Sequence, residues 1–249
     1  MDDIVRKRFG LVGRNISYSF SKGYFTDKFN NENFAGCTYE NFDIPEINAF
    51  PEVVKNTPDL KGMSITIPYK EAVIPFLHKL SKKALLIGAV NTIRITKKGK
   101  LKGYNTDYYG FKKSLQPLLE PHHKKALILG TGGASKGVAF ALDELNIPYT
   151  FVSREASETA IDYSRINATT FDNYQIIINA TPVGTSPNVA AFPLLPYEFF
   201  TAKHIAYDLI YNPAETQFLQ KAAAQGAKTK NGLDMLIFQA EKAWKIWNK

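Results

Sequence analysis

The sequence predicts an α/β protein made of two domains. Short apolar stretches typical of strands alternate with helical stretches along the chain, as in parallel sheets covered by helices on both faces. The alternation starts afresh after the polar segment "EPHHKK" at residues 120–125, so two βα series follow one another. A length of 249 residues accommodates one large domain or two smaller ones. We therefore expect two α/β domains with a boundary near residues 107–125.

The first series begins with strands and helices in alternation. The strand candidates are residues 8–13, 38–44 and 60–68, and the helix candidates are residues 21–30, 47–56 and 69–80. Ser21 is the expected N-cap of the first helix, because a serine hydroxyl can accept a hydrogen bond from an unpaired N–H group. Pro75 is expected to break the last helix.

A hairpin and a further helix complete the first series. Residues 89–105 have the pattern of two strands that turn at Lys98 and Gly99. Residues 106–119 then form a helix for which Asp107 is a natural N-cap. In the second series the strand candidates are residues 126–130, 147–154, 175–182 and 204–213, and the helix candidates are residues 134–140, a short stretch before residue 175, and residues 235–247.

The composition excludes several classes of protein. Hydrophobic residues make up 45% and charged residues 22%, as in ordinary globular chains, and no apolar run approaches the roughly 18 residues that cross a membrane. The first residues, "MDDIVRKRFG", lack the apolar core of a signal peptide. A single cysteine, Cys37, rules out an internal disulfide, and the histidines show no metal-ligand spacing. We expect a cytoplasmic protein with no metal and no membrane association.

The net charge of +8 is compatible with several kinds of partner. Lysines occur in small groups, such as Lys82 with Lys83 and Lys124 with Lys125, and not in one tract interleaved with aromatic residues. This distribution is typical of solvated turns and helix faces and does not favour nucleic acid. A positive potential also attracts small anions such as a carboxylate or a phosphate.

A glycine-rich turn at the start of the second series predicts a phosphate site. The apolar run 126–129 leads into Gly130, Gly132 and Gly133, and a helix follows. Glycines let a diphosphate approach the backbone, where the N–H groups of the helix start can bind it. The spacing departs from G-x-G-x-x-G at Ser135, so a turn that merely packs helix against strand remains an alternative.

The end of the next strand indicates which dinucleotide would bind. An acidic residue there holds the ribose hydroxyls of NAD, whereas an arginine accepts the 2′-phosphate of NADP. The strand at residues 147–154 ends in Ser153 and Arg154, which favours NADP. Glu155 would repel that phosphate unless its side chain turns away, so NAD remains an alternative cofactor.

Motifs along nearly the whole chain resemble those of the shikimate dehydrogenase family, which reduces 3-dehydroshikimate to shikimate with NADPH. In order they are "GLVGRNISYSFS", "MSITIPYK", "GAVNT", "GYNTD", "GTGGASKG", "INATPVG", "YDLIYNP" and "NGLDMLIFQAEKAWKIW". The resemblance implies a substrate-binding domain at residues 1–107 and 231–249, with the C-terminal helix packed back on it. Residues 108–230 would form a Rossmann-type NADP-binding domain. It further implies a small-molecule substrate and a monomer or homodimer.

By this resemblance Lys70 and Asp107 are the catalytic pair. Reduction of a carbonyl creates an alkoxide, so the site needs a proton donor. Lys70 lies in the first turn of a predicted helix, where the positive end of the helix dipole disfavours a cation and would lower its pKa. Asp107 would orient the ammonium and a substrate hydroxyl, although a plain helix cap is its structural alternative.

The resemblance also assigns the remaining site residues. The substrate contacts are Ser19, Ser21, Thr66, Asn91, Thr92, Tyr211 and Gln239. The cofactor contacts are Gly130, Thr131, Gly132, Gly133, Ala134, Ser153, Arg154, Asn179, Thr181, Gly232 and Met235. Each polar member could instead satisfy backbone groups or face a domain interface, but a polyhydroxylated ring needs several such donors and acceptors together. Asp234 stands where the family has a glycine.

Three other functions stay open from the sequence. A quinate dehydrogenase of the same superfamily, with NAD use, shares the catalytic pair. A non-catalytic module that senses NADP would keep the glycine turn but would not require Lys70 and Asp107. Nucleic-acid binding would show as salt-sensitive affinity.

Overall fold

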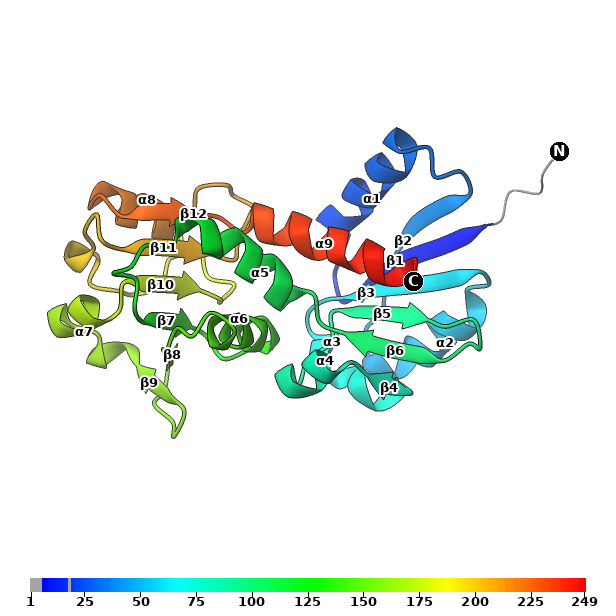
Figure 1. Cartoon of the computed structure of the whole chain (residues 1–249), viewed down its shortest axis with the longest axis horizontal. Coiled ribbons are helices and arrows are strands. Elements are labelled where there is room, and N and C mark those ends of the chain that lie inside the picture. The colour runs from blue at the N-terminus through cyan, green and yellow to red at the C-terminus, as the bar shows by residue number, and fades with distance from the viewer. Residues whose placement is uncertain (1–5, 18) are drawn as a thin grey trace. The chain divides into compact units, whose positions relative to one another are not determined.

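The computed structural model describes residues 6–17 and 19–249 (Figure 1). They form two compact units, of which the first contains the described residues up to Thr106 together with Ala240–Lys249 and the second contains Asp107–Gln239. Tyr18, inside the first motif, lies outside the described residues. No helix of the described chain is long and apolar enough to cross a membrane.

The sheet of the first unit is mixed. Its strands are β1 (Lys7–Gly13), β2 (Cys37–Asp43), β3 (Leu60–Ile65), β4 (Lys79–Leu80), β5 (Thr92–Ile95) and β6 (Leu101–Tyr104), in the order β2-β1-β3-β5-β6-β4. The pairs of β1 with β2 and β3 are parallel, whereas β5 is antiparallel to β3 and β6. The β5–β6 pair is the predicted hairpin, and Gly99 takes a φ of +72° in its turn.

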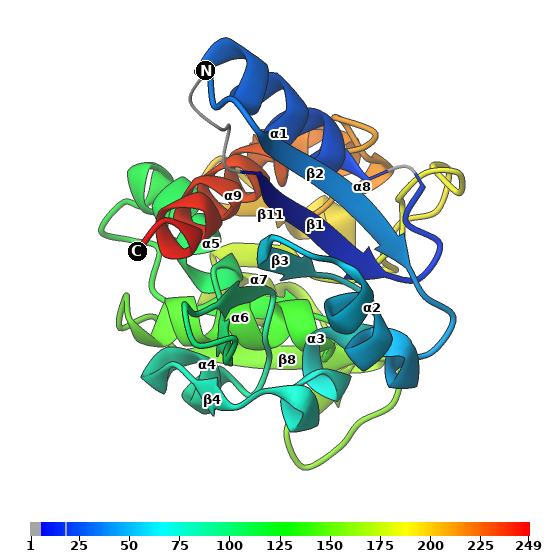
Figure 2. The same ribbon diagram turned by 90° about the vertical axis from the view of Figure 1, so that its right-hand side faces the viewer.

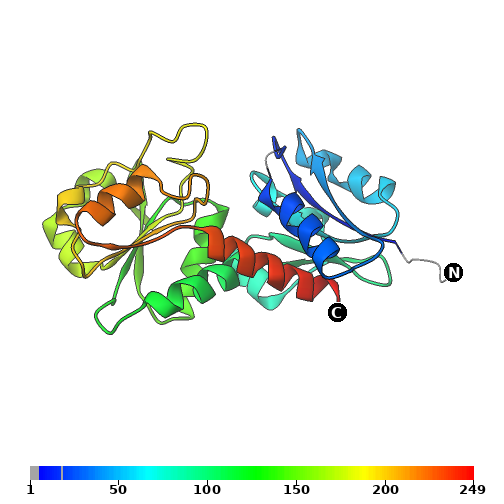
Figure 3. The same cartoon turned by 90° about the horizontal axis from the view of Figure 1, so that it is seen from above.

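Helices cover both faces of this first sheet (Figures 2 and 3). They are α1 (Phe20–Asn31), α2 (Phe50–Asn56), α3 (Tyr69–Ala72), α4 (Lys82–Ile87) and the second half of α9 (Leu233–Trp247). Successive strand residues point to opposite faces. Accordingly Phe9 and Leu11 pack with α1 and α9, whereas Val12 packs with α2 and α3.

The end of α9 fits closely against the first sheet, as predicted for the C-terminal helix. The indole Nε1 of Trp247 donates to the carbonyl oxygen of Ile93 at 3.0 Å. A Cβ at Gly62 would lie 2.2 Å from Cδ1 of Trp247, so only glycine leaves room for the ring. The prediction that this helix packs on the first domain's sheet is confirmed for residues 240–247.

The second unit has an entirely parallel sheet in the usual order of a dinucleotide-binding fold. Its strands are β7 (Ala126–Leu129), β8 (Tyr149–Ser153), β9 (Ala160–Asp162), β10 (Ile176–Asn179), β11 (Ile205–Asp208) and β12 (Lys228–Lys230). The order β12-β11-β10-β7-β8-β9 means that the chain reverses direction across the sheet between β7 and β10. In such sheets ligands bind outside the carboxyl ends of the strands at this switch point.

Helices also cover both faces of the second sheet (Figure 1). They are α5 (Asp107–Leu115), α6 (Gly133–Asp143), α7 (Ala168–Asn173), α8 (Gln217–Ala224) and the first half of α9. Phe171 of α7 and Phe218 of α8 pack on one face, and Phe111 of α5 meets Tyr207 on the other at 4.8 Å between ring centroids. The sequence predicts residues 231–239 in the first domain, but the structure groups them with the second unit, where they pack on α5 at Gly110.

Several short elements differ from the sequence prediction. The helix expected over residues 69–80 ends at Ala72, and a 3₁₀ turn, Ile74–Phe76, follows because Pro75 cannot donate a hydrogen bond within the helix. The elements α4, α8, β4, β9 and β12 were not predicted. α4 nevertheless carries both cap signals, since Ser81 accepts from the N–H of Ala84 at 3.2 Å and Gly88 takes a φ of +70°.

Two predicted helix caps are wrong by one or two residues. The N-cap of α1 is Ser19, whose Oγ accepts from the backbone N–H of Ser21 at 3.2 Å, and Ser21 lies inside the helix. α5 begins at Asp107, so this carboxylate occupies the first turn and not the position before it. A carboxylate in the first turn still interacts favourably with the helix dipole.

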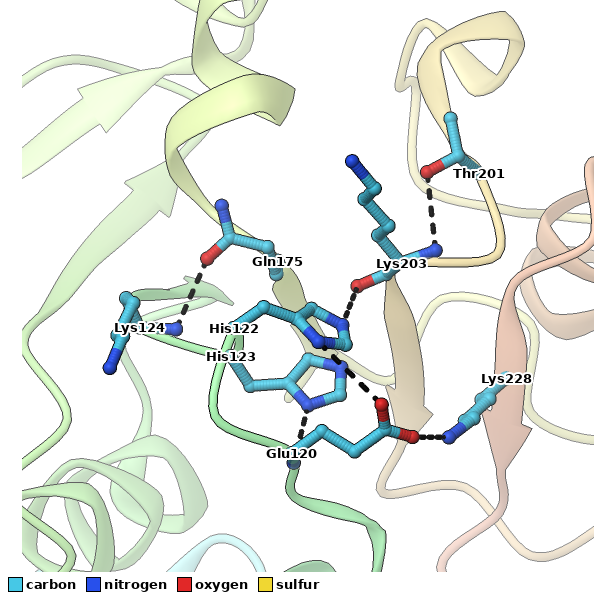
Figure 4. A network of polar contacts seen from close by, with 8 residues as sticks. All are labelled: Glu120, His122, His123, Lys124, Gln175, Thr201, Lys203 and Lys228. Atoms are coloured by element: carbon cyan, nitrogen blue, oxygen red, sulfur yellow. Dashed lines mark hydrogen bonds and ion pairs between the residues drawn. The ribbon is translucent and has the colours of Figure 1, made fainter.

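A histidine pair lies at the amino-terminal edge of the second sheet (Figure 4). Nδ1 of His123 accepts from the N–H of Glu120 at 2.8 Å, and the ring of His122 lies 4.1 Å away. Glu120 pairs with Lys228 and, at 3.6 Å, with Nδ1 of His122. Burial, the neighbouring His122, Lys228 and His204 lower the pKa of His123 below 6.5, against the opposing effect of Glu120. His123 therefore binds a proton less readily in the folded protein than in the unfolded chain.

We expect His123 to make the protein less stable as the pH falls below 6.5. The unfolded chain then binds a proton that the folded chain does not, so the free energy of unfolding decreases with falling pH. His123→Asn keeps an acceptor near the Nδ1 position and removes the titration, so its urea midpoint should depend less on pH between about 5 and 7. Asp208, with its pKa raised to about 6, contributes the opposite slope but is present in both proteins. Equal slopes in the two proteins would contradict the assignment.

Candidate active site

The predicted glycine turn follows β7 and has an open backbone. Gly130 takes a φ of +100°, and its N–H donates to the carbonyl oxygen of Val152 at 2.8 Å, which fixes the turn beside β8. Gly132 is the N-cap of α6, so no N-cap side chain accepts from the first N–H groups of this helix. A Cβ placed at Gly132 would meet nothing within 4 Å. Thr131 is exposed. The first N–H groups of α6 therefore face open space that suits a diphosphate.

The loop after β10 lies against this turn. The side chain of Asn179 is fully buried, and its Oδ1 accepts from the N–H of Thr181 at 3.1 Å and from its Oγ1 at 2.6 Å. A Cβ at Gly130 would lie 3.0 Å from Cγ2 of Thr181. The turns after β7 and β10 thus meet at the switch point of the sheet, where a dinucleotide fold binds its ligand.

The end of β8 lies beside these two turns. Val152 pairs in register with Leu129, so Ser153 and Arg154 follow beside the glycine turn. The Ser153 hydroxyl donates to the backbone carbonyl of Glu155, which shapes the bend there. Arg154 is exposed, and no residue of 6–17 or 19–249 engages its guanidinium in a hydrogen bond or an ion pair. It is available to a phosphate.

The segment before α9 requires glycine at one position. A Cβ at Gly232 would lie 2.0 Å from the carbonyl oxygen of Leu209, and the N–H of Gly232 donates to Ile210 at 3.0 Å. The backbone therefore passes directly over the end of β11. Asp234, the charge that departs from the family pattern, pairs with Lys230, which offsets its charge locally.

Two predicted substrate contacts, Tyr211 and Gln239, and the predicted cofactor contact Met235 belong to the second unit. Met235 and Gln239 are buried, and Nε2 of Gln239 donates to the carbonyl oxygen of Leu236 at 2.9 Å. Tyr211 is half-buried and follows β11.

In the first unit a buried amide organises the predicted substrate loop. Oδ1 of Asn91 accepts from the N–H of Thr106 at 2.6 Å and from the hydroxyl of Thr92 at 3.1 Å. Its Nδ2 donates to Oγ1 of Thr106 at 2.9 Å. The structure therefore brings the "GAVNT" and "GYNTD" motifs together, and Asp107 is the next residue along the chain.

Backbone hydrogen bonds fix the position of Lys70. Its carbonyl oxygen accepts from the N–H of Val90 at 2.7 Å, and the N–H of Tyr69 donates to Thr66 at 2.9 Å. Both bonds tie the start of α3 to the ends of β3 and β5. α3 spans only 4 residues, so the helix dipole acting on Lys70 is weaker than the longer predicted helix implied.

The loop that carries Ser19 is anchored on β2. The carboxylate of Asp43 accepts from the N–H groups of Asn15 at 2.9 Å and Ile16 at 3.0 Å. Nδ2 of Asn41 donates to the carbonyl oxygen of Ile16 at 3.0 Å. These bonds fix the entry to α1, where the Ser19 hydroxyl caps the helix.

Comparisons with known proteins agree with this architecture. Residues 11–93 match the family described as shikimate dehydrogenase substrate binding domain. Shikimate dehydrogenase (NADP(+)) of Caldanaerobacter subterraneus subsp. tengcongensis is 37% identical over 267 residues, which cover 98% of this chain and 92% of the relative. The enzyme of Caldicellulosiruptor saccharolyticus is 35% identical over 260 residues, with 97% and 92% covered. The chain belongs to the shikimate dehydrogenase family.

A solved structure of this family supports the fold over both units. Shikimate 5-dehydrogenase from Thermus thermophilus, crystallised with NADP(H) and shikimate, aligns with a TM-score of 0.85 at 32% identity. The alignment covers 97% of this chain and 93% of that one. The predicted fold class and the resemblance to shikimate dehydrogenases are thereby confirmed.

Sequence reasoning missed a buried carboxylate that supports Asn179, one of the predicted cofactor contacts. Asp208, at the end of β11, is fully buried, and burial raises its pKa to about 6. It accepts from Nδ2 of Asn179 at 3.1 Å, the N–H of Ile210 at 3.0 Å and Oγ1 of Thr216 at 2.6 Å. An acidic residue directly after the apolar run "HIAY" was the available signal, since buried carboxylates are rare without such partners.

Proposed function

We propose that this chain is a shikimate dehydrogenase that catalyses the reversible NADPH-dependent reduction of 3-dehydroshikimate to shikimate. The observation that carries the proposal is the similarity to NADP-dependent shikimate dehydrogenases over 97–98% of the chain, which spans both units. The open glycine turn at the switch point fits the diphosphate of the cofactor. When bound, NADPH supplies the hydride that reduces the substrate carbonyl.

The chain's own residues would divide the remaining tasks. Nζ of Lys70 delivers a proton to the oxygen of the reduced carbonyl, and Asp107 orients that ammonium. Arg154 binds the 2′-phosphate, and the N–H groups after Gly132 bind the diphosphate. The hydroxyls of Ser19 and Ser21 donate to the substrate carboxylate.

Further residues would complete both binding sites. Around the substrate ring we place Thr66, Asn91, Thr92, Tyr211 and Gln239, and around the cofactor Gly130, Thr131, Gly133, Ala134, Ser153, Asn179, Thr181, Gly232 and Met235. The division into residues 1–107 with 231–249 for the substrate and 108–230 for the cofactor belongs to this proposal. We expect a cytoplasmic monomer or homodimer that acts on a small molecule and not on nucleic acid.

The direct test follows the absorbance of NADPH after addition of 3-dehydroshikimate. Turnover with this pair, and much weaker turnover of quinate with NAD, is the expected result. Preferred turnover of quinate would identify a quinate dehydrogenase instead. Nucleotide binding without turnover of either substrate would favour the sensing module.

The cofactor assignment gives a separate prediction. Arg154→Ala should weaken NADP binding by about 1.5–3 kcal/mol, the range for a charge-assisted hydrogen bond, and leave NAD binding nearly unchanged. Calorimetric titration with both cofactors checks this. Arg165→Ala, which removes an exposed arginine that pairs with Asp162 in the same unit, is the control and should change neither affinity. Equal losses for both cofactors would show that Arg154 is structural.

A further inference from the structure

A row of buried hydroxyls crosses the first sheet on its α1 and α9 face. Ser64 of β3 pairs in register with Leu11 of β1 and with Thr92 of β5, so the two hydroxyl residues lie side by side. Tyr39 of β2 belongs to the same face as Leu11. Tyr39, Ser64 and Thr92 are 4%, 7% and 0% exposed. Thr92 is itself one of the proposed substrate contacts of this unit.

The ring of Tyr39 is held rigidly in this row. It stacks on Phe25 of α1 with centroids 4.7 Å apart and an interplanar angle of 14°, and it lies 6.3 Å from Trp247 of α9. The hydroxyl direction is therefore set by the packing of the ring. Burial raises the pKa of the Tyr39 phenol, and the nearby hydroxyls of Ser64 and Ser21 lower it by less. The phenol stays protonated at neutral pH.

The Tyr39 hydroxyl is nevertheless unsatisfied. Its oxygen is buried, and among residues 6–17 and 19–249 no group forms a hydrogen bond with it. A buried hydroxyl without a partner costs about 1–3 kcal/mol, so its presence calls for a physical reason. Ser21, which is 9% exposed, lies one helical turn before Phe25, on the buried face of α1 that packs against Tyr39.

We propose that Tyr39 is a positioning residue for the substrate carboxylate, acting through Ser21. This inference rests on the proposed function. When the Ser21 O–H donates to the carboxylate, its Oγ can accept a hydrogen bond from the Tyr39 hydroxyl. The resulting chain from Tyr39 to Ser21 to the carboxylate is cooperative, because each bond polarises the next. Ser19 complements it, since its Oγ already accepts from the N–H of Ser21 and its own O–H can donate.

The test is Tyr39→Phe, which removes only the hydroxyl. We expect the KM and the Kd for shikimate to rise roughly 2- to 10-fold, which is the loss of one hydrogen bond, with kcat and NADP affinity unchanged. The Tm of the ligand-free protein should stay the same or increase, because an unpaired buried hydroxyl is lost. In a Ser21→Ala background the same change should have no further effect on shikimate binding.

Tyr24→Phe is the matched control in the same aromatic cluster. The Tyr24 hydroxyl donates to Oε1 of Glu241 at 2.5 Å, so its loss should lower the Tm and leave the KM for shikimate unchanged. If Tyr39→Phe behaves like this control, Tyr39 is structural and the inference is wrong. If wild-type protein binds shikimate and Tyr39→Phe binds it equally well, the inference fails and the proposed function stands. If wild-type protein neither binds nor turns over shikimate, both fail.

Discussion

Lys70→Ala is expected to lower kcat by about 10² to 10⁴, the usual range for the loss of a positioned acid–base group. The ammonium matters most as negative charge develops on the substrate oxygen, so the KM for shikimate should change much less than kcat. NADP affinity should stay near the wild-type value, because the proposed cofactor contacts belong to the second unit. Steady-state kinetics with shikimate and calorimetric titration with NADP measure these quantities.

Variants of Asp107 and of the distant Lys82 serve as the partner test and the control for this experiment. Asp107→Asn keeps a polar side chain in the first turn of α5 and removes the charge, so kcat should fall without unfolding. The double variant of Lys70 and Asp107 should be little worse than the poorer single one, because the two groups act as a unit. Lys82→Ala removes an exposed lysine of α4 and should leave kcat unchanged. A variant of Lys70 that raises KM at full kcat would make Lys70 a binding residue and refute its role as proton donor.

Gly110→Ala should destabilise the second unit by about 1–3 kcal/mol or more, the range for overpacking a close contact. A Cβ at Gly110 would lie 2.3 Å from the carbonyl oxygen of Met235 and 3.1 Å from the backbone N of Gln239. Both atoms belong to the backbone of α9, so no side chain can turn away and the helix itself must shift. Because Met235 and Gln239 are proposed site residues, shikimate turnover should decrease as well.

Gly23→Ala is the matched control for this prediction. Gly23 also lies inside a helix, α1, but a Cβ there meets nothing within 4 Å. The change should raise stability by about 0.5–1 kcal/mol, because alanine loses less conformational freedom in a helix. Urea midpoints and the Tm of both variants check the comparison. If the two substitutions have the same effect, the close crossing of α5 and α9 does not constrain the fold.

Local sequence patterns predict the parallel strands and the glycine turn of the second unit. The apolar runs at 126–129 and 175–179 sit between helical stretches, and buried parallel strands have this continuous apolar character. Gly130 marks a turn, because its φ of +100° is a backbone conformation that a residue with a side chain rarely adopts. Arg154 directly follows β8, which pairs with β7, so it lies near that turn, and its role at the cofactor stays a prediction.

Features that depend on distant partners could not be read in this way. β4 has only 2 residues and is defined by its pairing with β6, so it is too short to show the alternation of apolar and polar residues that predicts a strand. Ser19, and not Ser21, caps α1. The loop before this helix is held by Asp43, which accepts from the N–H of Asn15 although the two residues are 28 positions apart in the sequence. Either serine satisfies the local rule for an N-cap.

The site residues also divide into those that local sequence indicates and those that depend on the fold. Lys70 and Asp107 belong to short motifs, and their charge follows directly from the residue type. The burial of Asp208, the room that Gly110 leaves for α9 and the unpaired hydroxyl of Tyr39 arise from contacts between segments far apart in sequence. A side chain's desolvation and its hydrogen-bond partners are properties of the packed fold, because both depend on which surfaces meet, and a linear pattern of residue types does not contain that information.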